Sequence, residues 1–120
     1  MYFFDSSAII EILKDNEEVI NKYGESQLIT INLAYGEIYY YCIRSNITKE
    51  EFKELSLDLV DYDLEDIEKA MELLYKIKKE VKNFGFIDSL IYTIAIKNGF
   101  ILVTKDLGFK GLPNVEMIVA

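Results

Sequence analysis

Residues 87–103 read IDSLIYTIAIKNGFILV and contain the clearest sign of the chain's architecture. The apolar residues from Ile87 to Ala95 recur every three or four positions, and Gly99 can end such a helix. The next segment, Phe100–Val103, is apolar at every position, which is typical of a strand buried on both faces. A helix followed at once by a buried strand predicts a parallel sheet that is covered by helices.

The start of the chain has the same alternation. Residues 2–4 are a short apolar run that predicts a strand, and Asp5 stands at its end. Ser6 and Ser7 are candidates to cap the helix that is predicted by the apolar spacing after them. The chain therefore begins with a strand and a helix.

A second strand and helix follow in the middle of the chain. Leu28–Ile31 is apolar and β-branched, and Asn32 can cap a helix that runs through Glu37 towards Arg44. Gly36 is unfavourable inside a helix, so we expect this helix to start late or to be tightly packed there. The other elements predicted from spacing and caps are a helix from about Asn16 to Tyr23, a helix behind the Thr48–Glu51 capping box, a strand at residues 60–64, a helix from Ile67 to Val81 and a last strand at residues 116–119. Together they predict one α/β domain over residues 1–120, with a mostly parallel sheet between layers of helices.

The composition excludes several classes of function. The 120 residues contain 13 basic and 21 acidic side chains, a net charge of −8, and no histidine. Bulk electrostatic attraction to nucleic acid is therefore not expected, and catalytic triads or zinc sites that need an imidazole are excluded. Carboxylates are the groups left for chemistry, and an all-oxygen ligand set favours Mg²⁺ or Mn²⁺.

The sequence also indicates the compartment. The single cysteine, Cys42, cannot form a disulfide within the chain, and the first residues lack the pattern of a signal peptide. Arg44, Lys53 and the acids interrupt every apolar run before it reaches the roughly 18 residues that a membrane helix requires. We expect a soluble, cytoplasmic protein with no membrane partner.

Four acids are predicted to meet at one edge of the sheet. Asp5 ends the first strand, Asp88 begins a helix, and Asp106 follows the buried strand. Glu37 lies one turn into the helix after the second strand. Ligands of parallel α/β folds bind beside the carboxyl ends of the strands. Clustered carboxylates repel one another, and two divalent cations would compensate them and change the net charge from −8 to about −4.

Each of these acids also has a simpler explanation. Asp5 and Asp88 could be helix N-caps, and Asp106 could form a turn before Gly108. The other acids are assigned to the surface or to caps, without chemistry; they include Asp61, Asp63, Asp66, Glu68, Glu50 and Glu51.

Glu37 is expected to differ from the other three acids. The neighbours on its side of a helix are Leu33, Tyr40 and Tyr41, so its carboxylate should lie in an apolar stripe. An unpaired charge there costs several kcal/mol, and a cation or a partner is the usual solution. The alternative is a shifted helix face that lets Glu37 reach solvent.

Four segments carry a resemblance to a known family. They are YFFDSSAII at residues 2–10, INLAYGEI at 31–38, FIDSLIYTIAI at 86–96 and ILVTKDLGF at 101–109. In this order they resemble the PIN-domain nucleases, in particular the small VapC-like toxins of type II toxin–antitoxin systems. The resemblance spans the whole chain and implies a PIN-like three-layer α/β/α fold with a five-stranded, mostly parallel sheet.

The resemblance also implies a function, namely hydrolysis of RNA phosphodiester bonds with one or two Mg²⁺ or Mn²⁺ ions. The residues that match the family's four acids are Asp5, Glu37, Asp88 and Asp106. Thr104 matches a hydroxyl that would orient a ligand or a phosphate, and it could equally be a threonine that favours a strand end. The basic candidates near this site, each of which could equally be a solvated surface cation, are Arg44, Lys105 and Lys110.

RNA, a cognate antitoxin and a second copy of the chain are the expected partners. The tyrosines of the middle helix exceed what one side of a helix can bury, so a dimer or antitoxin surface should use some of them; they are Tyr35, Tyr39, Tyr40 and Tyr41. Two alternatives stay open: a metal-free interaction module with the same fold, and another acid-cluster phosphohydrolase of the receiver or haloacid dehalogenase type. The dehalogenase motif needs an acid two residues after Asp5, where Ser7 stands.

Overall fold

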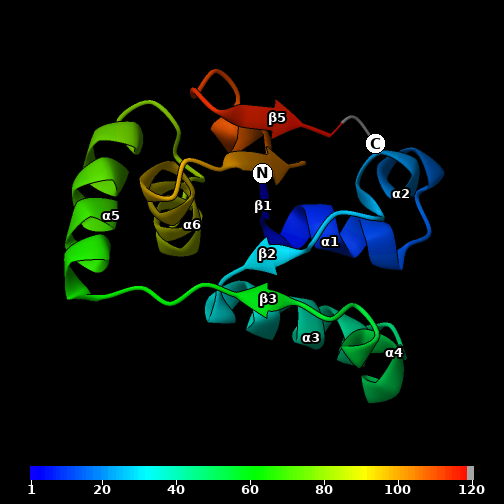
Figure 1. Ribbon diagram of the computed structural model, residues 1–120. Helices are drawn as coiled ribbons and strands as arrows, with labels where there is room; N and C mark the ends of the chain where they lie inside the picture. The colour runs from blue at the N-terminus through cyan, green and yellow to red at the C-terminus, as the bar shows by residue number, and fades with distance from the viewer. Residues whose placement is uncertain (119–120) are drawn as a thin grey trace.

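The computed structural model describes residues 1–118, and strands and helices alternate along them (Figure 1). The elements are β1 (Tyr2–Phe4), α1 (Ser6–Leu13), α2 (Glu17–Tyr23), β2 (Ile29–Thr30), α3 (Asn32–Arg44), α4 (Lys49–Lys53), β3 (Asp58–Leu59), α5 (Leu64–Ile77), α6 (Phe86–Lys97), β4 (Ile101–Thr104), the 3₁₀ turn η1 (Leu107–Phe109) and β5 (Val115–Met117). No helix within this part of the chain has the length and apolar character needed to cross a membrane.

Short parallel strands form the middle layer. β1, β4 and β5 are hydrogen-bonded in the order β1-β4-β5, with Phe3 opposite Leu102 and Val103 opposite Glu116. β2 and β3 form a second parallel pair, and β2 lies beside β1. In Figure 1, α5 and α6 lie on one side of β1 and β4, and α1 and α2 lie on the other. The predicted three-layer α/β/α fold with a mostly parallel sheet is confirmed.

The strands separate the hydrophobic core into two halves. Phe3 and Leu102 pack with residues of α5 and α6, whereas Phe4 and Val103 pack with residues of α1, α2 and α3. All four side chains are fully buried, because successive strand residues point to opposite faces and both faces are covered by helices. This packing holds β1 and β4 in register, so the loops that follow them lie next to each other.

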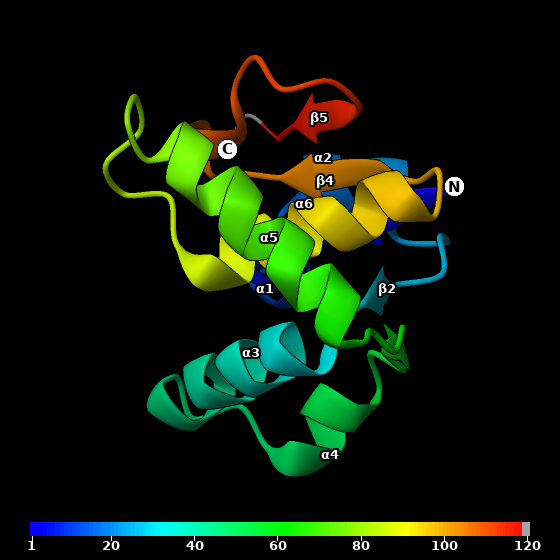
Figure 2. The same cartoon turned by 90° about the vertical axis from the view of Figure 1, so that its left-hand side faces the viewer.

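The helix that the sequence predicts before β4 is buried on most of its surface. Leu90, Ile91, Ile94 and Ala95 of α6 are each at most 1% exposed. Figure 2 shows α5 lying across α6 on the outer side of the molecule. Gly99 follows the end of α6 with φ of +69°, a left-handed conformation that glycine adopts without steric cost, and the chain turns there into β4.

Several predicted boundaries are wrong. β3 is Asp58–Leu59, and the strand predicted at residues 60–64 does not form. Asp63 is instead the N-cap of α5, where it exchanges two hydrogen bonds with Asp66 in a capping box. The box satisfies two backbone N–H donors, and this stabilisation outweighs the alternating pattern, so α5 begins earlier than predicted. It also ends earlier than predicted, at Ile77. The last strand is β5, and the predicted strand residue Val119 lies outside the described residues.

The expectations for the start of α3 are also corrected. Asn32 is the first residue of α3, and the capping position is Ile31, which makes no side-chain hydrogen bond. A Cβ atom on Gly36 would meet no described atom within 4 Å. The helix therefore neither starts late nor packs tightly at Gly36.

Candidate active site

Asp5 lies between β1 and α1 and is 4% exposed. Its Oδ1 accepts a hydrogen bond from the backbone N–H of Ala8 at 3.0 Å, so Asp5 itself caps α1, in place of the predicted Ser6 or Ser7. The positive end of the helix favours a negative charge at this position. Within residues 1–118, however, no lysine or arginine forms an ion pair with Asp5.

Two hydroxyl groups hold the carboxylate of Asp5. Ser7 Oγ donates to Oδ1 at 2.6 Å, and Thr104 Oγ1 donates to Oδ2. Each hydroxyl accepts in turn from the loop after β4: the N–H of Lys105 donates to Ser7 Oγ at 2.9 Å, and the N–H of Asp106 donates to Thr104 Oγ1 at 3.0 Å. We call these two hydroxyls, of Ser7 and Thr104, the hydroxyl clamp. It fixes Asp5 and links it to the loop that carries Asp106.

Burial dominates the electrostatics of Asp5. It raises the pKa of the carboxyl group to about 6, although the hydrogen bonds from Ser7, Thr104 and Ala8 act in the opposite direction. The negative charge of Asp88 raises this pKa further. The ionised form of Asp5 is therefore less favourable in the folded protein than in water, and a nearby positive charge would stabilise it.

Asp88 lies in the first turn of α6 and is partly buried. Its Oδ2 accepts a hydrogen bond from the N–H of Gly85 at 3.0 Å, so the predicted capping role exists. Burial raises the pKa of Asp88, and the charges of Asp106 and Glu37 raise it as well. Asp106 and Glu37 therefore each lie close enough to Asp88 to repel its negative charge.

Asp106 follows β4 and caps the turn η1. Its Oδ1 accepts a hydrogen bond from the N–H of Gly108 at 2.9 Å, and a Cβ atom at Gly108 would lie 3.2 Å from that oxygen. The turn-forming role that the sequence left open is therefore present. It uses one oxygen of the carboxylate, and Oδ2 makes no hydrogen bond to a residue that the structure describes.

Glu37 is exposed, which corrects the expectation that it lies in an apolar stripe. The buried face of α3 consists of Ala34, Ile38 and Cys42, so the helix is rotated away from the predicted face and Tyr40 is 62% exposed. Glu37 nevertheless points towards the start of α1, because Ser6 Oγ donates to its Oε1 at 3.0 Å. The shifted helix face is thus the correct alternative, and it still leaves Glu37 near enough to Asp88 for their charges to interact.

The four predicted acids are connected through Asp88, whose charge acts on Asp5 and which is itself acted on by the charges of Asp106 and Glu37. In Figure 2 the arrowheads of β4 and β5 point towards the side on which α6 begins. The acids do not form a finished metal site, since no three acidic or cysteine side chains among residues 1–118 are placed to hold an ion as they stand. The donor chemistry does fit a hard cation: all the donors are oxygens, and Asp5 is buried with a raised pKa and no basic partner in this range.

Ser7 is a member of this site that the sequence pattern presents only as a capping candidate. The sequence feature that could have identified Ser7 is its position in the first turn of a helix, two residues after an acid that ends a strand. In this position the hydroxyl can donate a hydrogen bond to that acid. Among residues 1–118, the charged groups of the basic candidates form no ion pair with the four acids. Arg44 is 5.1 Å from the ring centroid of Tyr40, Lys110 is exposed, and the ammonium group of Lys105 contacts Glu11 at 3.4 Å.

Asp66 is one of the acids that the sequence assigns to the surface or to caps. It is a capping residue, as expected, but it is only 2% exposed and pairs with Lys97 at 3.1 Å.

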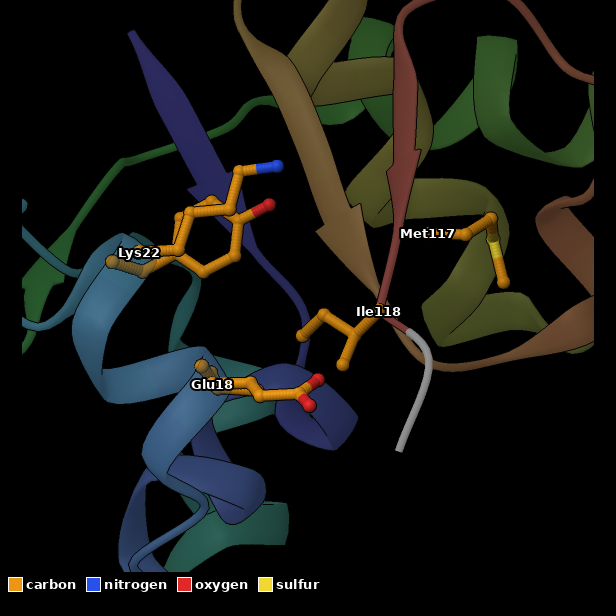
Figure 3. Close-up of a pocket in the computed structure, with 6 residues that line it drawn as sticks. Glu18, Lys22, Met117 and Ile118 are labelled. Atoms are coloured by element: carbon orange, nitrogen blue, oxygen red, sulfur yellow. The ribbon is translucent and has the colours of Figure 1, made fainter.

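A cavity of about 160 Å³ between α2 and β5 contains none of the predicted site residues (Figure 3). Its lining consists of Glu18, Val19, Lys22, Tyr23, Met117 and Ile118.

Comparison with known proteins gives the class of this chain. The PIN domain family model matches residues 2–114, so the chain belongs to the PIN domain family. This membership decides against the receiver and dehalogenase classes that the sequence had left open.

Three solved structures share the fold at low sequence identity. A chain of a toxin–antitoxin complex from Klebsiella pneumoniae has a TM-score of 0.80 at 17% identity, covering 98% of this chain and 97% of that one. A chain of VapBC2 from Rickettsia felis, bound to a DNA fragment of its promoter, has a TM-score of 0.66 at 20% identity, covering 98% and 96%. VapC20 of Mycobacterium tuberculosis, a toxin that cleaves the sarcin-ricin loop, has a TM-score of 0.67 at 14% identity, covering 93% and 92%. No curated protein matches the sequence.

Proposed function

We propose that this protein is a metal-dependent endoribonuclease and the toxin of a toxin–antitoxin pair. The observation that carries the proposal is Asp5, a buried acid with a raised pKa and no basic partner within residues 1–118. The charge of Asp88 acts on Asp5, and the charges of Asp106 and Glu37 act on Asp88. Membership of the PIN domain family and the likeness in fold to an RNA-cleaving toxin support RNA as the substrate.

The proposed ligands of one or two Mg²⁺ or Mn²⁺ ions are Asp5, Glu37, Asp88 and Asp106. Such an ion, when bound, activates water for attack on phosphorus and stabilises the charge that develops on the leaving oxygen. We assign the central positions to Asp5 and Asp88, because burial destabilises the ionised form of both carboxylates and a positive charge would stabilise it. The exposed Glu37 and the partly exposed Asp106 complete the set or orient water.

The hydroxyl clamp prepares Asp5 for this role. Ser7 and Thr104 donate to both oxygens of the carboxylate, so its orientation is fixed before any ligand binds. Thr104 also accepts from the N–H of Asp106, so its hydroxyl connects the carboxylate of Asp5 with the backbone of a second proposed ligand. Thr104 is therefore a positioning residue in this proposal.

The proposal includes a cognate antitoxin, a homodimer, a cytoplasmic location and a single domain over residues 1–120. Two of the similar structures are toxin–antitoxin complexes by description, which supports the antitoxin. Two tyrosines of α3, Tyr35 and Tyr39, pack against Phe52, although Tyr35 is still 37% exposed. Tyr41 is half-buried and Tyr40 is 62% exposed. Tyr40, with the 58% exposed Ile43, offers apolar surface to a partner.

The test is cleavage of total cellular RNA by the purified protein in Mn²⁺, with Asp88→Asn as the site variant. Asp88→Asn should reduce the rate at least ~10²-fold, because it removes a charge from the proposed ligand set. Asp61→Asn is the matched control, since Asp61 is exposed and outside the site, and its rate should stay within a few-fold. Wild-type protein that cuts no RNA, or equal losses in the two variants, would contradict the proposal.

One observation favours a second candidate function, a metal-free interaction module with the PIN fold. The acids among the described residues do not stand as an assembled ligand cluster. A module of this kind should show the same melting temperature with and without Mn²⁺, because a ligand stabilises a protein only by binding its native state.

A further inference from the structure

Glu11 is a buried acid outside the predicted site. It lies on α1, is 5% exposed, and accepts a hydrogen bond from Asn16 Nδ2 at 3.0 Å. Its Oε2 lies 3.4 Å from the Nζ atoms of both Lys14 and Lys105. The hydrogen bond from Asn16, followed by the contacts with Lys105, holds the pKa of Glu11 below its usual range. Glu11 is therefore a buried anion with its counter-charges in place.

The two lysines come from different parts of the chain. Lys14 follows α1 itself, three residues after Glu11, so its pairing joins nothing distant. Lys105 belongs to the loop after β4, between Thr104 of the clamp and Asp106 of the proposed ligand set. Only the second pairing connects α1 with the loop that carries site residues.

Lys105 is anchored to α1 at two points. Its ammonium group contacts Glu11, and its backbone N–H donates to Ser7 Oγ at 2.9 Å. Ser7 in turn donates to Asp5 at 2.6 Å. The pair of Glu11 and Lys105 is thus continuous, through Ser7, with the carboxylate that the proposed function places at the centre of the site.

We propose that Glu11 and Lys105 are positioning residues, which hold the loop at residues 104–106 against α1 and so set Asp5 and Asp106 in their working positions. This inference rests on the proposed function. Neither side chain touches the reacting atoms in this scheme. Loosening the pair lets the loop move, which disturbs the clamp and weakens the affinity for the metal.

A direct contact between Lys105 and an RNA phosphate is the main competing role. The two roles differ in the effect of Glu11→Gln. If Lys105 binds phosphate, this substitution frees its charge for RNA, so KM should fall or stay constant and the salt dependence should increase. If Lys105 positions the loop, Glu11→Gln should lower kcat in the same way as Lys105→Met, with little change in KM.

Lys105→Met and Lys14→Met are a matched pair of test variants. Each removes a partly exposed lysine at 3.4 Å from the same oxygen, so both should shift the melting temperature by a similar small amount. Lys105→Met should lower kcat about tenfold and raise the Mn²⁺ concentration needed for half-maximal rate by a similar factor. Effects of this size are typical when a residue that supports the metal ligands is removed. Lys14→Met should change both by less than about twofold, and Lys105→Arg should restore most of the loss.

Amide hydrogen exchange in EDTA is a second readout that does not depend on activity. Lys105→Met should speed exchange of the backbone N–H groups at positions 105 and 106, and Lys14→Met should leave both exchange rates unchanged. Equal behaviour of the two variants in exchange and in kcat would overturn the positioning role, as would an increase in KM alone. A wild-type protein without RNA cleavage would instead overturn the proposed function, and the exchange result would still decide whether Lys105 holds the loop.

Discussion

Asp5 and Asp66 are two buried aspartates that cap helices in the same fold, and their surroundings differ in one respect. Asp66 is 2% exposed and receives Lys97 at 3.1 and 3.2 Å, besides the backbone N–H of Asp63 at 3.0 Å. The hydrogen bond from Asp63, with the contacts of Lys97, lowers the pKa of Asp66. Asp5 accepts hydrogen bonds from two hydroxyl groups and from the backbone N–H of Ala8, but no lysine or arginine of residues 1–118 pairs with it, and burial raises its pKa to about 6.

The comparison separates structural acids from functional ones. Glu11, also buried, resembles Asp66 because lysines compensate its charge. Burial of a carboxylate is therefore not the sign of a site in this protein. What marks a functional site here is a buried carboxylate that has no positively charged partner in the described part of the chain. Such an uncompensated charge destabilises the fold, and a protein retains it where a ligand will compensate the charge.

The largest effects should come from neutralising these two aspartates separately. Asp5→Asn should reduce RNA cleavage at least about 10³-fold and raise the free energy of unfolding in EDTA at pH 8, because it removes a desolvated charge. Asp66→Asn should lower the free energy of unfolding, because it breaks the pair with Lys97, and should leave the rate per folded molecule within a few-fold. Denaturant unfolding and single-turnover cleavage measure both. Changes of the same sign in the unfolding free energies of the two variants would contradict the distinction between a functional Asp5 and a structural Asp66.

The next effect is the dependence of stability on pH in EDTA. The folded-state pKa of Asp5 is raised from 3.8 to about 6, so the neutral form is favoured in the folded protein. Its contribution to stability is complete below about pH 4 and is lost as the pH rises through about 6, a loss of about 3 kcal/mol at 1.36 kcal/mol per pKa unit. Asp66 has the opposite sign: its contribution is present above its unfolded pKa and is lost as the pH falls through its lowered folded pKa.

Asp5→Asn isolates the first of these contributions. The difference in unfolding free energy between the variant and the wild type should grow in favour of the variant between pH 4 and 7 and then level off. Urea titrations at several pH values give this difference directly. A constant difference over that range would show that Asp5 ionises freely in the folded protein.

The smallest effect should be that of Glu37→Gln on stability. Glu37 is exposed and contacts Ser6, so its substitution should change the free energy of unfolding by no more than about 0.5 kcal/mol. The rate of RNA cleavage should still fall more than in Asp61→Asn, because Glu37 lies beside Asp88. A variant with full nuclease activity would remove Glu37 from the proposed ligand set.

The sequence predicted those parts of the fold and site that local rules control. Asp5, Asp88 and Asp106 stand at strand ends or helix starts, so the topology of a parallel sheet predicts that they meet. The rotation of α3 was not predictable, because Leu33 and Tyr41 compete with Ala34, Ile38 and Cys42 for the buried face, and tertiary packing decides the outcome.

The contacts that support the site were also beyond the sequence. The pairing of Glu11 with Lys105 spans 94 residues, and no local pattern marks either side chain as a partner of the other. Residues 60–64 alternate like a strand, yet the capping box at Asp63 and Asp66 decides that segment. In both cases the outcome depends on which buried polar groups need hydrogen-bond or charged partners once the chain is folded.

The central claim is that Asp5 retains an uncompensated charge because a divalent cation compensates it. Isothermal titration of Mn²⁺ into the wild type, Asp5→Asn and Asp66→Asn at pH 8 tests this claim without RNA. The wild type and Asp66→Asn should bind Mn²⁺ with similar affinity, and Asp5→Asn should lose at least about tenfold in affinity, since a missing carboxylate ligand weakens every ion it contacts. Equal binding by the wild type and Asp5→Asn, or no binding by the wild type, would contradict the account.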